Sequence, residues 1–254
     1  MRIRAVAVNT FRETIRNRVL LNILIFAIGM ILLSLVIGDW SLYQQSRVIK
    51  DFGLSAMSIF GLLIAIFIGI RLMVQELEQR TIYVVASKPI HRWELLLGKY
   101  TGLSLTLAVN VLLMSLALGA AVWLMEGTPD WKLAPAIVLI YLEICLIVAF
   151  ALFFSSFVSP TLAAIFTLAI FTIGHLSGFL RDYVEIYPDQ GFHWLLRGIY
   201  YTAPNLEMLN LKMAVVGYLP TPPNALLWGL VYGISYTLLL LLLTMLIFER
   251  RDFK

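Results

Sequence analysis

Few residues of this chain could do chemistry, and their spacing does not form a catalytic constellation. Tyr100 follows Gly98-Lys99, where a phosphate-binding loop requires Ser or Thr, and Trp93 stands in the place of its first glycine. No nucleophile elbow is present. Three histidines lack the spacing of metal ligands: His91, His175 and His193. We therefore expect that this chain is not an enzyme, and that it needs no cofactor or metal.

A buried carboxylate is the strongest remaining candidate. Glu143 lies in the middle of an apolar run, where an ionised carboxylate needs a partner, a water-filled cavity or a proton. It either lines a translocation path or is a neutral glutamic acid bonded to a neighbouring helix, and both readings stay open. Asn110 is a second candidate for the path, although an interhelical hydrogen bond is the commoner role of such an amide and of Asn22. We expect a structural role for His175 and a packing role for Cys145.

The elements that carry these residues are predicted to be membrane helices. Hydrophobic residues make up 61% of the 254 and charged residues 13%, about half the charged share of a soluble domain. Apolar runs of about 20 residues, the length that crosses the hydrocarbon core, occur six times. They are Val19–Gly38, Phe52–Ile70, Thr101–Met125, Leu133–Phe157, Thr161–Leu180 and Ala225–Phe248. The fold class is therefore an all-α integral membrane protein with six transmembrane helices, forming one domain over 1–254.

The distribution of Lys and Arg predicts the orientation of these spans. The basic residues of the N-terminal tail, the segment after the second span and the C-terminal tail lie on one side, and they number 13 of the 19. The other six lie on the opposite side, spread over more residues. Because Lys and Arg are enriched in cytoplasmic loops, both termini and the segment after the second span are expected in the cytoplasm.

Three segments outside the spans have patterns of their own. Residues 1–18 combine arginines with apolar residues at every fourth position, which predicts an amphipathic elbow helix in the membrane interface. Residues 181–224 form a large outer loop with short re-entrant helices, because its prolines exclude one continuous helix. Residues 76–98 form a charged cytoplasmic segment. Within it, Pro89 is predicted to start a short amphipathic helix through Leu97 that lies parallel to the membrane and is suited to docking on a soluble partner.

The charged segment also resembles a known family. Its sequence, ELEQRTIYVVASKPIHRWELLLGK, is similar to the cytoplasmic signature of type 2 (exporter-type) ABC transporter permeases. Arg80 stands where that signature commonly has glycine. The segments YYTAPNLEMLNLK and FERRDFK, and the six-span layout, also resemble the family. The matching residues of the signature are Glu76, Glu78, Thr81, Pro89, Arg92, Leu97, Gly98 and Lys99.

The resemblance implies a permease that pairs with a second permease chain, either a copy or a paralogue, with each chain docking one cytosolic ABC ATPase. It implies export across the plasma membrane, which in bacteria is the inner membrane. Membrane lipid is a further expected partner, and no nucleic-acid partner is expected. The substrate is not implied. The ATPase-coupling residues would be Glu76, Glu78, Arg80, Thr81, Pro89, Arg92, Trp93, Glu94, Leu97, Gly98 and Lys99.

Two other classes of function remain. A self-contained secondary transporter or ion channel would use Glu143 as its ion or proton site, and it predicts internal repeats, which the sequence does not show convincingly. The second alternative class is a membrane scaffold that transports nothing. Co-purification of an ATPase subunit separates the permease from both.

Overall fold

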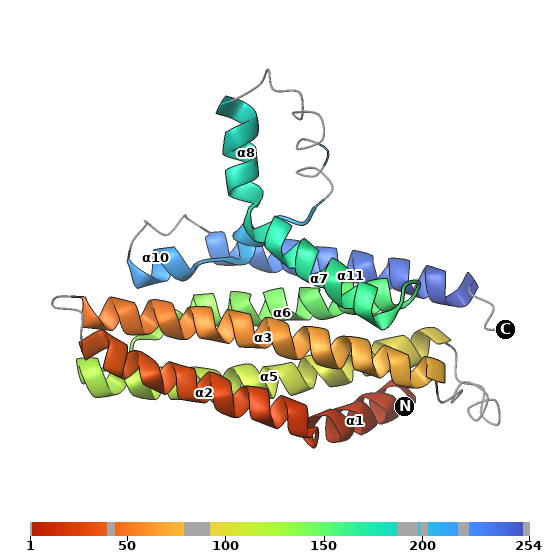
Figure 1. Cartoon of the computed structure of the whole chain (residues 1–254), viewed down its shortest axis with the longest axis horizontal. Coiled ribbons are helices and arrows are strands. Elements are labelled where there is room, and N and C mark those ends of the chain that lie inside the picture. The colour runs from red at the N-terminus through yellow and green to blue at the C-terminus, as the bar shows by residue number, and fades with distance from the viewer. Residues whose placement is uncertain are drawn as a thin grey trace.

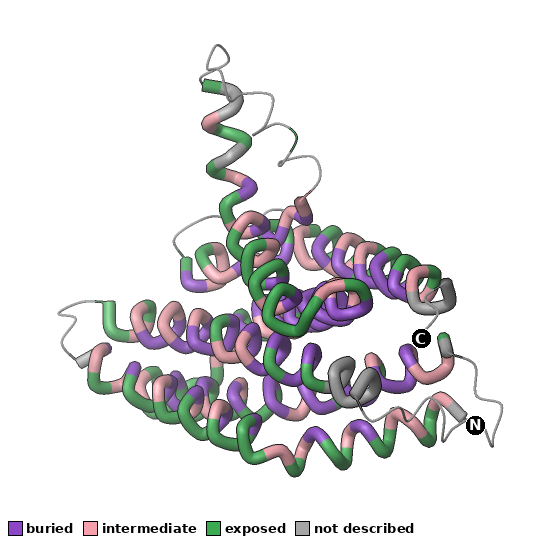
Figure 2. The backbone as a smooth tube through the Cα atoms, turned by 45° about the vertical axis from the view of Figure 1, so that its right-hand side comes forward, coloured by how far each residue is buried: buried purple, intermediate pink, exposed green. Residues whose placement is uncertain are grey.

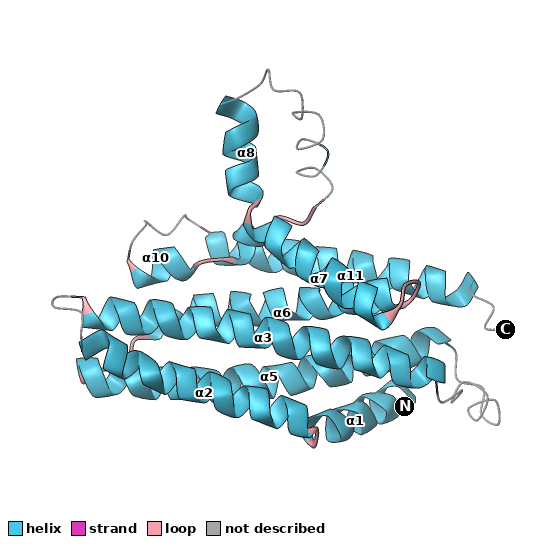
Figure 3. Cartoon of the chain, in the orientation of Figure 1, coloured by secondary structure: helices cyan, strands magenta, loops and turns pink. Residues whose placement is uncertain are grey.

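The computed structural model describes residues 2–39, 44–78, 92–186, 198, 203–217 and 224–250, and within them the chain is helical with no strand (Figure 3). Within these described residues, five helices are long and apolar enough to cross a membrane, or six if the bent pair α7 and α8 counts as one span. This confirms an all-α integral membrane protein. The helices are α1 (Arg2–Ile15), α2 (Arg18–Asp39), α3 (Gln45–Glu78), α5 (Arg92–Glu126), α6 (Ala134–Ser155), α7 (Pro160–His175), α8 (Ser177–Ile186), α10 (Lys212–Val216) and α11 (Ala225–Arg250), with 3-10 turns η2 (Trp131–Leu133) and η3 (Leu206–Leu209).

The long helices form a bundle with a central element, α6. Its residues from Glu143 to Leu152 are buried without interruption. Both α3 and α11 pack against α6 through small residues: a Cβ on Gly61 would overlap Ile144, and one on Gly229 would lie 2.9 Å from Leu139. Figure 2 shows buried residues gathered in the middle of the bundle, while the outer helices carry exposed residues on one face. Small residues of α3 and α11 therefore allow these helices to pack closely on α6.

The predicted span Thr161–Leu180 is broken. The helix α7 ends at His175, and α8 begins at Ser177 with a bend of 56° between them. In Figure 1, α8 rises away from the bundle. The chain before and within η3 fills the space beside the break, since a Cβ on Gly174 would lie 2.9 Å from the carbonyl oxygen of Pro204. The glycine therefore lets distant backbone approach the end of α7, a contact that hydropathy does not report.

The prediction of a separate short helix over Pro89–Leu97 is wrong for the residues from Arg92 onward. Arg92 opens α5, which continues without a break for 35 residues to Glu126. A helix of that length is about 52 Å long, well beyond the roughly 30 Å of a hydrocarbon core. The amphipathic turns are therefore an extension of the membrane helix and not a separate element. Pro89 itself lies outside the described residues.

The elbow helix α1 is present, and it packs along the first turns of α5. Gly98 and Gly102 make this contact possible. A Cβ on Gly98 would lie 2.6 Å from Val6 Cβ, and one on Gly102 would lie 2.6 Å from the carbonyl oxygen of Ala7. We call the end of the bundle that holds α1, the first turns of α5 and the last turns of α3 and α11 the α1 end (Figure 1).

We expect Gly102→Ala to destabilise the protein by about 1–3 kcal/mol, the usual cost of overpacking. A rotamer change cannot relieve a clash with the backbone of Ala7, so α1 must shift. Gly119→Ala is the matched control on the same helix, because nothing lies within 4 Å of its Cβ position. It should be neutral or stabilising by up to about 1 kcal/mol, since alanine favours helix. Thermal unfolding in detergent measures both, and equal stabilities would contradict the close α1–α5 contact.

Candidate functional site

The described part of the predicted coupling segment lies at the α1 end and has two faces. Trp93 is 38% exposed, whereas Glu94 and Leu97 are half-buried. Gly98 and Lys99 are buried, and Gly98 packs on α1 of the same chain. The first turn of α5 thus presents an aromatic side chain outward while its second turn packs inward on α1.

The remaining coupling residues are placed only in part. Glu76 and Glu78 fall in the last turn of α3, and Arg92 is the first residue of α5. Arg80, Thr81 and Pro89 lie outside the described residues. The helices α3 and α5 bring the two ends of the charged segment to the same end of the bundle (Figure 1).

Glu143 lies in a second polar cluster, inside the bundle. Its side chain is 1% exposed, and its Oε1 lies 3.3 Å from Nε2 of His175. Both carboxylate oxygens and Nε2 are buried, and Ser58 of α3 lies close enough to the carboxylate to act as a hydrogen-bond donor. Ser58 of α3 is also buried, and Lys212 of α10 lies near enough to interact electrostatically. Four helices, α3, α6, α7 and α10, therefore contribute polar groups to one place.

The contacts of the histidine restrict the protonation of this pair. Nδ1 of His175 lies 3.2 Å from the carbonyl oxygen of Phe171. A carbonyl only accepts, so Nδ1 must carry the hydrogen. The approach of Nε2 to Glu143 is then favourable only if one proton lies between them. That proton belongs either to an imidazolium facing a carboxylate or to a neutral glutamic acid facing a neutral imidazole.

Lys212, at the start of α10, adds a positive charge near this pair. Burial lowers the pKa of the Lys212 ammonium, although attraction to Glu143 and Asp51 opposes the shift. The sequence indicated the importance of Glu143 but not its partners. The structural role expected for His175 overlooked the contact with Glu143. The sequence did contain a signal for this contact. Glu143 and His175 are the two acidic or basic residues inside the predicted spans, and such residues usually pair with one another within a membrane.

Asn110 does not make the expected interhelical bond. It is buried, and its Nδ2 donates to the carbonyl oxygen of Thr106 on its own helix at 2.8 Å. Asn22 is exposed on α2. Cys145 is buried in the core, as expected. Among the described residues no three His, Cys, Asp or Glu side chains converge as metal ligands would.

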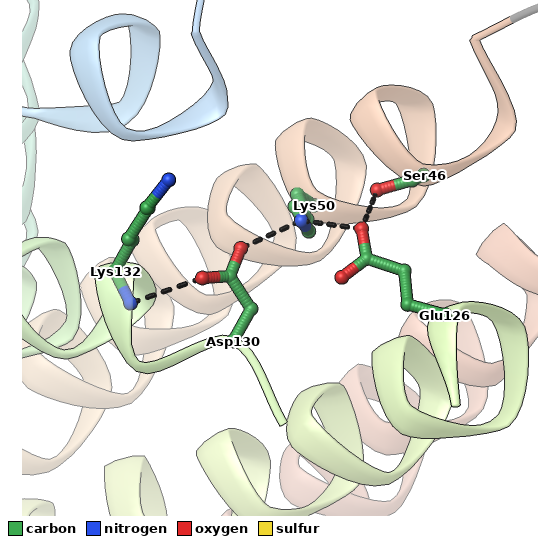
Figure 4. Close-up of polar contacts among 5 residues, drawn as sticks. All are labelled: Ser46, Lys50, Glu126, Asp130 and Lys132. Carbon is green, nitrogen blue, oxygen red and sulfur yellow. Dashed lines mark hydrogen bonds and ion pairs between the residues drawn. The ribbon is translucent and has the colours of Figure 1, made fainter. Parts of the chain in front are cut away.

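A third cluster, at the end of the bundle opposite α1, was not predicted. Nζ of Lys50 lies 2.6 Å from Oε1 of Glu126 and 2.6 Å from Oδ2 of Asp130 (Figure 4). Ser46 donates to Glu126, and the backbone N–H of Lys132 donates to Asp130 at 3.1 Å. Burial opposes ionisation of Asp130, but the hydrogen bonds from Lys50 and Lys132 prevail and lower its pKa. This cluster ties the start of α3 to the connection between α5 and α6.

The apolar helices and their packing define a multi-pass α-helical membrane protein. A profile of the ABC-2 family transporter proteins (ABC2_membrane_2) matches residues 4–253. The chain therefore belongs to the ABC-2 transporter family. Its members are membrane components of ABC transporters, so this chain is a permease subunit of a transporter that includes an ATPase partner. The search among curated proteins found no match.

Proposed function

We propose that this permease pairs with a second permease chain and two cytosolic ABC ATPases, and that the complex exports its substrate. The observation that carries the proposal is the family match over residues 4–253. The geometry of the α1 end supports it. The uncharged run Phe52–Ile70 of α3 ends before Arg71, but the helix continues to Glu78, and the first turn of α5 carries the exposed Trp93. Helices that leave the membrane together provide a stiff base for a soluble partner.

Co-purification tests this assembly. The full chain, tagged at one terminus and extracted from native membranes in mild detergent, should carry a nucleotide-binding subunit that mass spectrometry identifies. A secondary transporter, a channel or a scaffold would be isolated without one. Absence of an ATPase under several detergents, with the permease monodisperse, would overturn the proposal.

The proposed orientation places both termini and the α1 end in the cytoplasm, and residues 181–224 outside. It rests on the excess of Lys and Arg in the segments at the α1 end. In a Cys145-free background, a membrane-impermeant thiol reagent added to intact cells should label Asp189→Cys but not Lys254→Cys. Membrane disruption should allow both to react. Labelling of Lys254→Cys alone in intact cells would reverse the topology.

We propose that Glu143 belongs to the translocation path of the ABC permease. The supporting observation is its burial beside His175, with the polar side chains of Ser58 and Lys212 near it. The variant below tests whether the pair acts in transport.

We expect Glu143→Gln to insert and assemble like the parent but to transport about tenfold more slowly. That change corresponds to an increase of roughly 1.4 kcal/mol in the activation free energy of transport. Glutamine keeps the shape and removes the titratable proton. His175→Gln should lose a similar amount, and the double variant little more, because the two groups share one proton. The measurement is ATP-dependent uptake of the transported substrate by inverted vesicles from about pH 5 to about pH 9. Unchanged uptake in Glu143→Gln at every pH would reduce the pair to packing.

A further inference from the structure

A cavity opens at the α1 end, where α1 joins α2 beside the end of the apolar part of α3. Its volume is about 380 Å³. Arg16 and Arg18 line it from the α1–α2 connection, and Arg71 lines it from α3. Apolar contacts come from Val19 and Ile68. We call this the arginine cavity.

The charge of the arginine cavity favours an anion. All three arginines are exposed, and among the described residues none of them has a hydrogen-bond or ion-pair partner. Glu13 is the one acidic residue of the lining, so two net positive charges remain. The first turn of α2 adds the positive end of a helix dipole, with Asn17 Oδ1 accepting from the N–H of Val19 at 2.9 Å. Guanidinium groups bind phosphate oxygens through paired hydrogen bonds.

The position of the cavity relates it to the membrane boundary. Arg18 comes directly before the uncharged run Val19–Gly38, and Arg71 comes directly after the uncharged run Phe52–Ile70. Both guanidinium groups therefore lie where an uncharged run of a membrane-spanning helix ends. Lipid phosphates lie at that level, immediately outside the hydrocarbon core.

An apolar surface continues from the cavity along α2 and α3. Phe26 lies seven residues beyond Val19, on the same face of α2, and is 63% exposed. Its ring contacts Phe60 of α3, with centroids 5.6 Å apart. A ligand with a phosphate in the cavity and an acyl chain along these rings would match both parts of the surface. A free phosphate would use only the first part.

We propose that the arginine cavity is a binding site for an anionic phospholipid of the leaflet at the α1 end, with Arg16, Arg18 and Arg71 holding its phosphate. The site is separate from the transport function, because its evidence is the cavity and not the coupling segment. The bound headgroup would bridge α1–α2 to α3 at the membrane surface.

Native mass spectrometry of the full chain in detergent tests the site with phosphatidylglycerol as the probe. The parent should retain phosphatidylglycerol at least about tenfold more tightly than phosphatidylcholine. Arg18→Gln with Arg71→Gln should remove most of that preference. Arg4→Gln with Arg12→Gln is the control, because it removes the same charge from exposed positions of α1 outside the cavity. Arg71→Lys, which keeps the charge, should give intermediate retention.

Each alternative has its own result. Equal retention by the cavity and control variants would show only general attraction of lipid to a basic protein, and would overturn the proposal. Inorganic phosphate that binds the parent but not the cavity variant, without any preference for phosphatidylglycerol, would identify a free-anion site instead. Unchanged lipid retention with loss of ATPase co-purification would assign the arginines to a protein interface. If the double variant is not monodisperse, Arg71→Lys alone decides: unchanged retention contradicts the paired phosphate contacts.

Discussion

Trp93→Ala is expected to abolish transport and to weaken ATPase binding by about thirtyfold, equivalent to roughly 2 kcal/mol. Trp93 lies in the first turn of α5 at the α1 end and remains 38% exposed in the isolated chain. Large aromatic side chains that become buried at an interface commonly carry much of its binding energy. If the ATPase covers this end, removal of the indole leaves an unfilled space at the contact while α5 itself is preserved.

Trp123 provides a matched control on the same helix. It lies near the opposite end of α5 and is 57% exposed, so Trp123→Ala removes a similar side chain away from the α1 end. Pull-down of the ATPase by detergent-purified variants should separate the two, with membrane insertion checked independently. Arg92→Glu should weaken assembly mildly and in a salt-dependent way, as expected of charge at the rim of an interface. Parental binding and transport by Trp93→Ala would exclude the coupling role of this segment.

Lys50→Met is expected to lower the free energy of unfolding by about 1–2 kcal/mol, between the values for exposed and for buried ion pairs, because Lys50 is buried whereas Glu126 and Asp130 keep contact with water. Methionine fills a similar volume but removes the ammonium that contacts both Glu126 and Asp130. The two carboxylates would then repel each other with no cation between them. Since these contacts tie α3 to the connection between α5 and α6, the bundle should loosen at this end.

The remaining residues of the cluster allow a rescue experiment. Adding Glu126→Gln and Asp130→Asn to Lys50→Met should recover most of the loss, because the repulsion disappears with the charges. Lys132→Met is the control: its side chain is exposed and attracts Asp130 only through space, whereas its hydrogen bond to Asp130 comes from its backbone N–H and survives the substitution. Thermal unfolding near neutral pH measures all three. A stability of Lys50→Met equal to that of the control would show that the cluster is only a surface feature.

Local patterns in the chain were sufficient to predict the helices but not every boundary. A membrane span can be recognised in the sequence because it needs about 20 apolar residues to cross a hydrocarbon core of known thickness. The helical bundle confirms the all-α membrane class. The four-residue apolar repeat of the N-terminal tail predicted the helix α1, whereas its position in the membrane interface stays a prediction. Of the coupling candidates, Trp93 is described and exposed, whereas Arg80, Thr81 and Pro89 lie outside the described residues.

Contacts between distant residues required the tertiary structure. Hydropathy treated Thr161–Leu180 as one span, because an average over a window does not register the approach of Pro204 to Gly174. The helix α7 ends at His175, which lies 3.3 Å from Glu143, a residue 32 positions earlier in the sequence. Lys50 likewise meets Glu126 across 76 positions. Helix formation depends on neighbours along the chain, whereas the pairing of buried charges depends on which helix faces are brought together when the bundle packs.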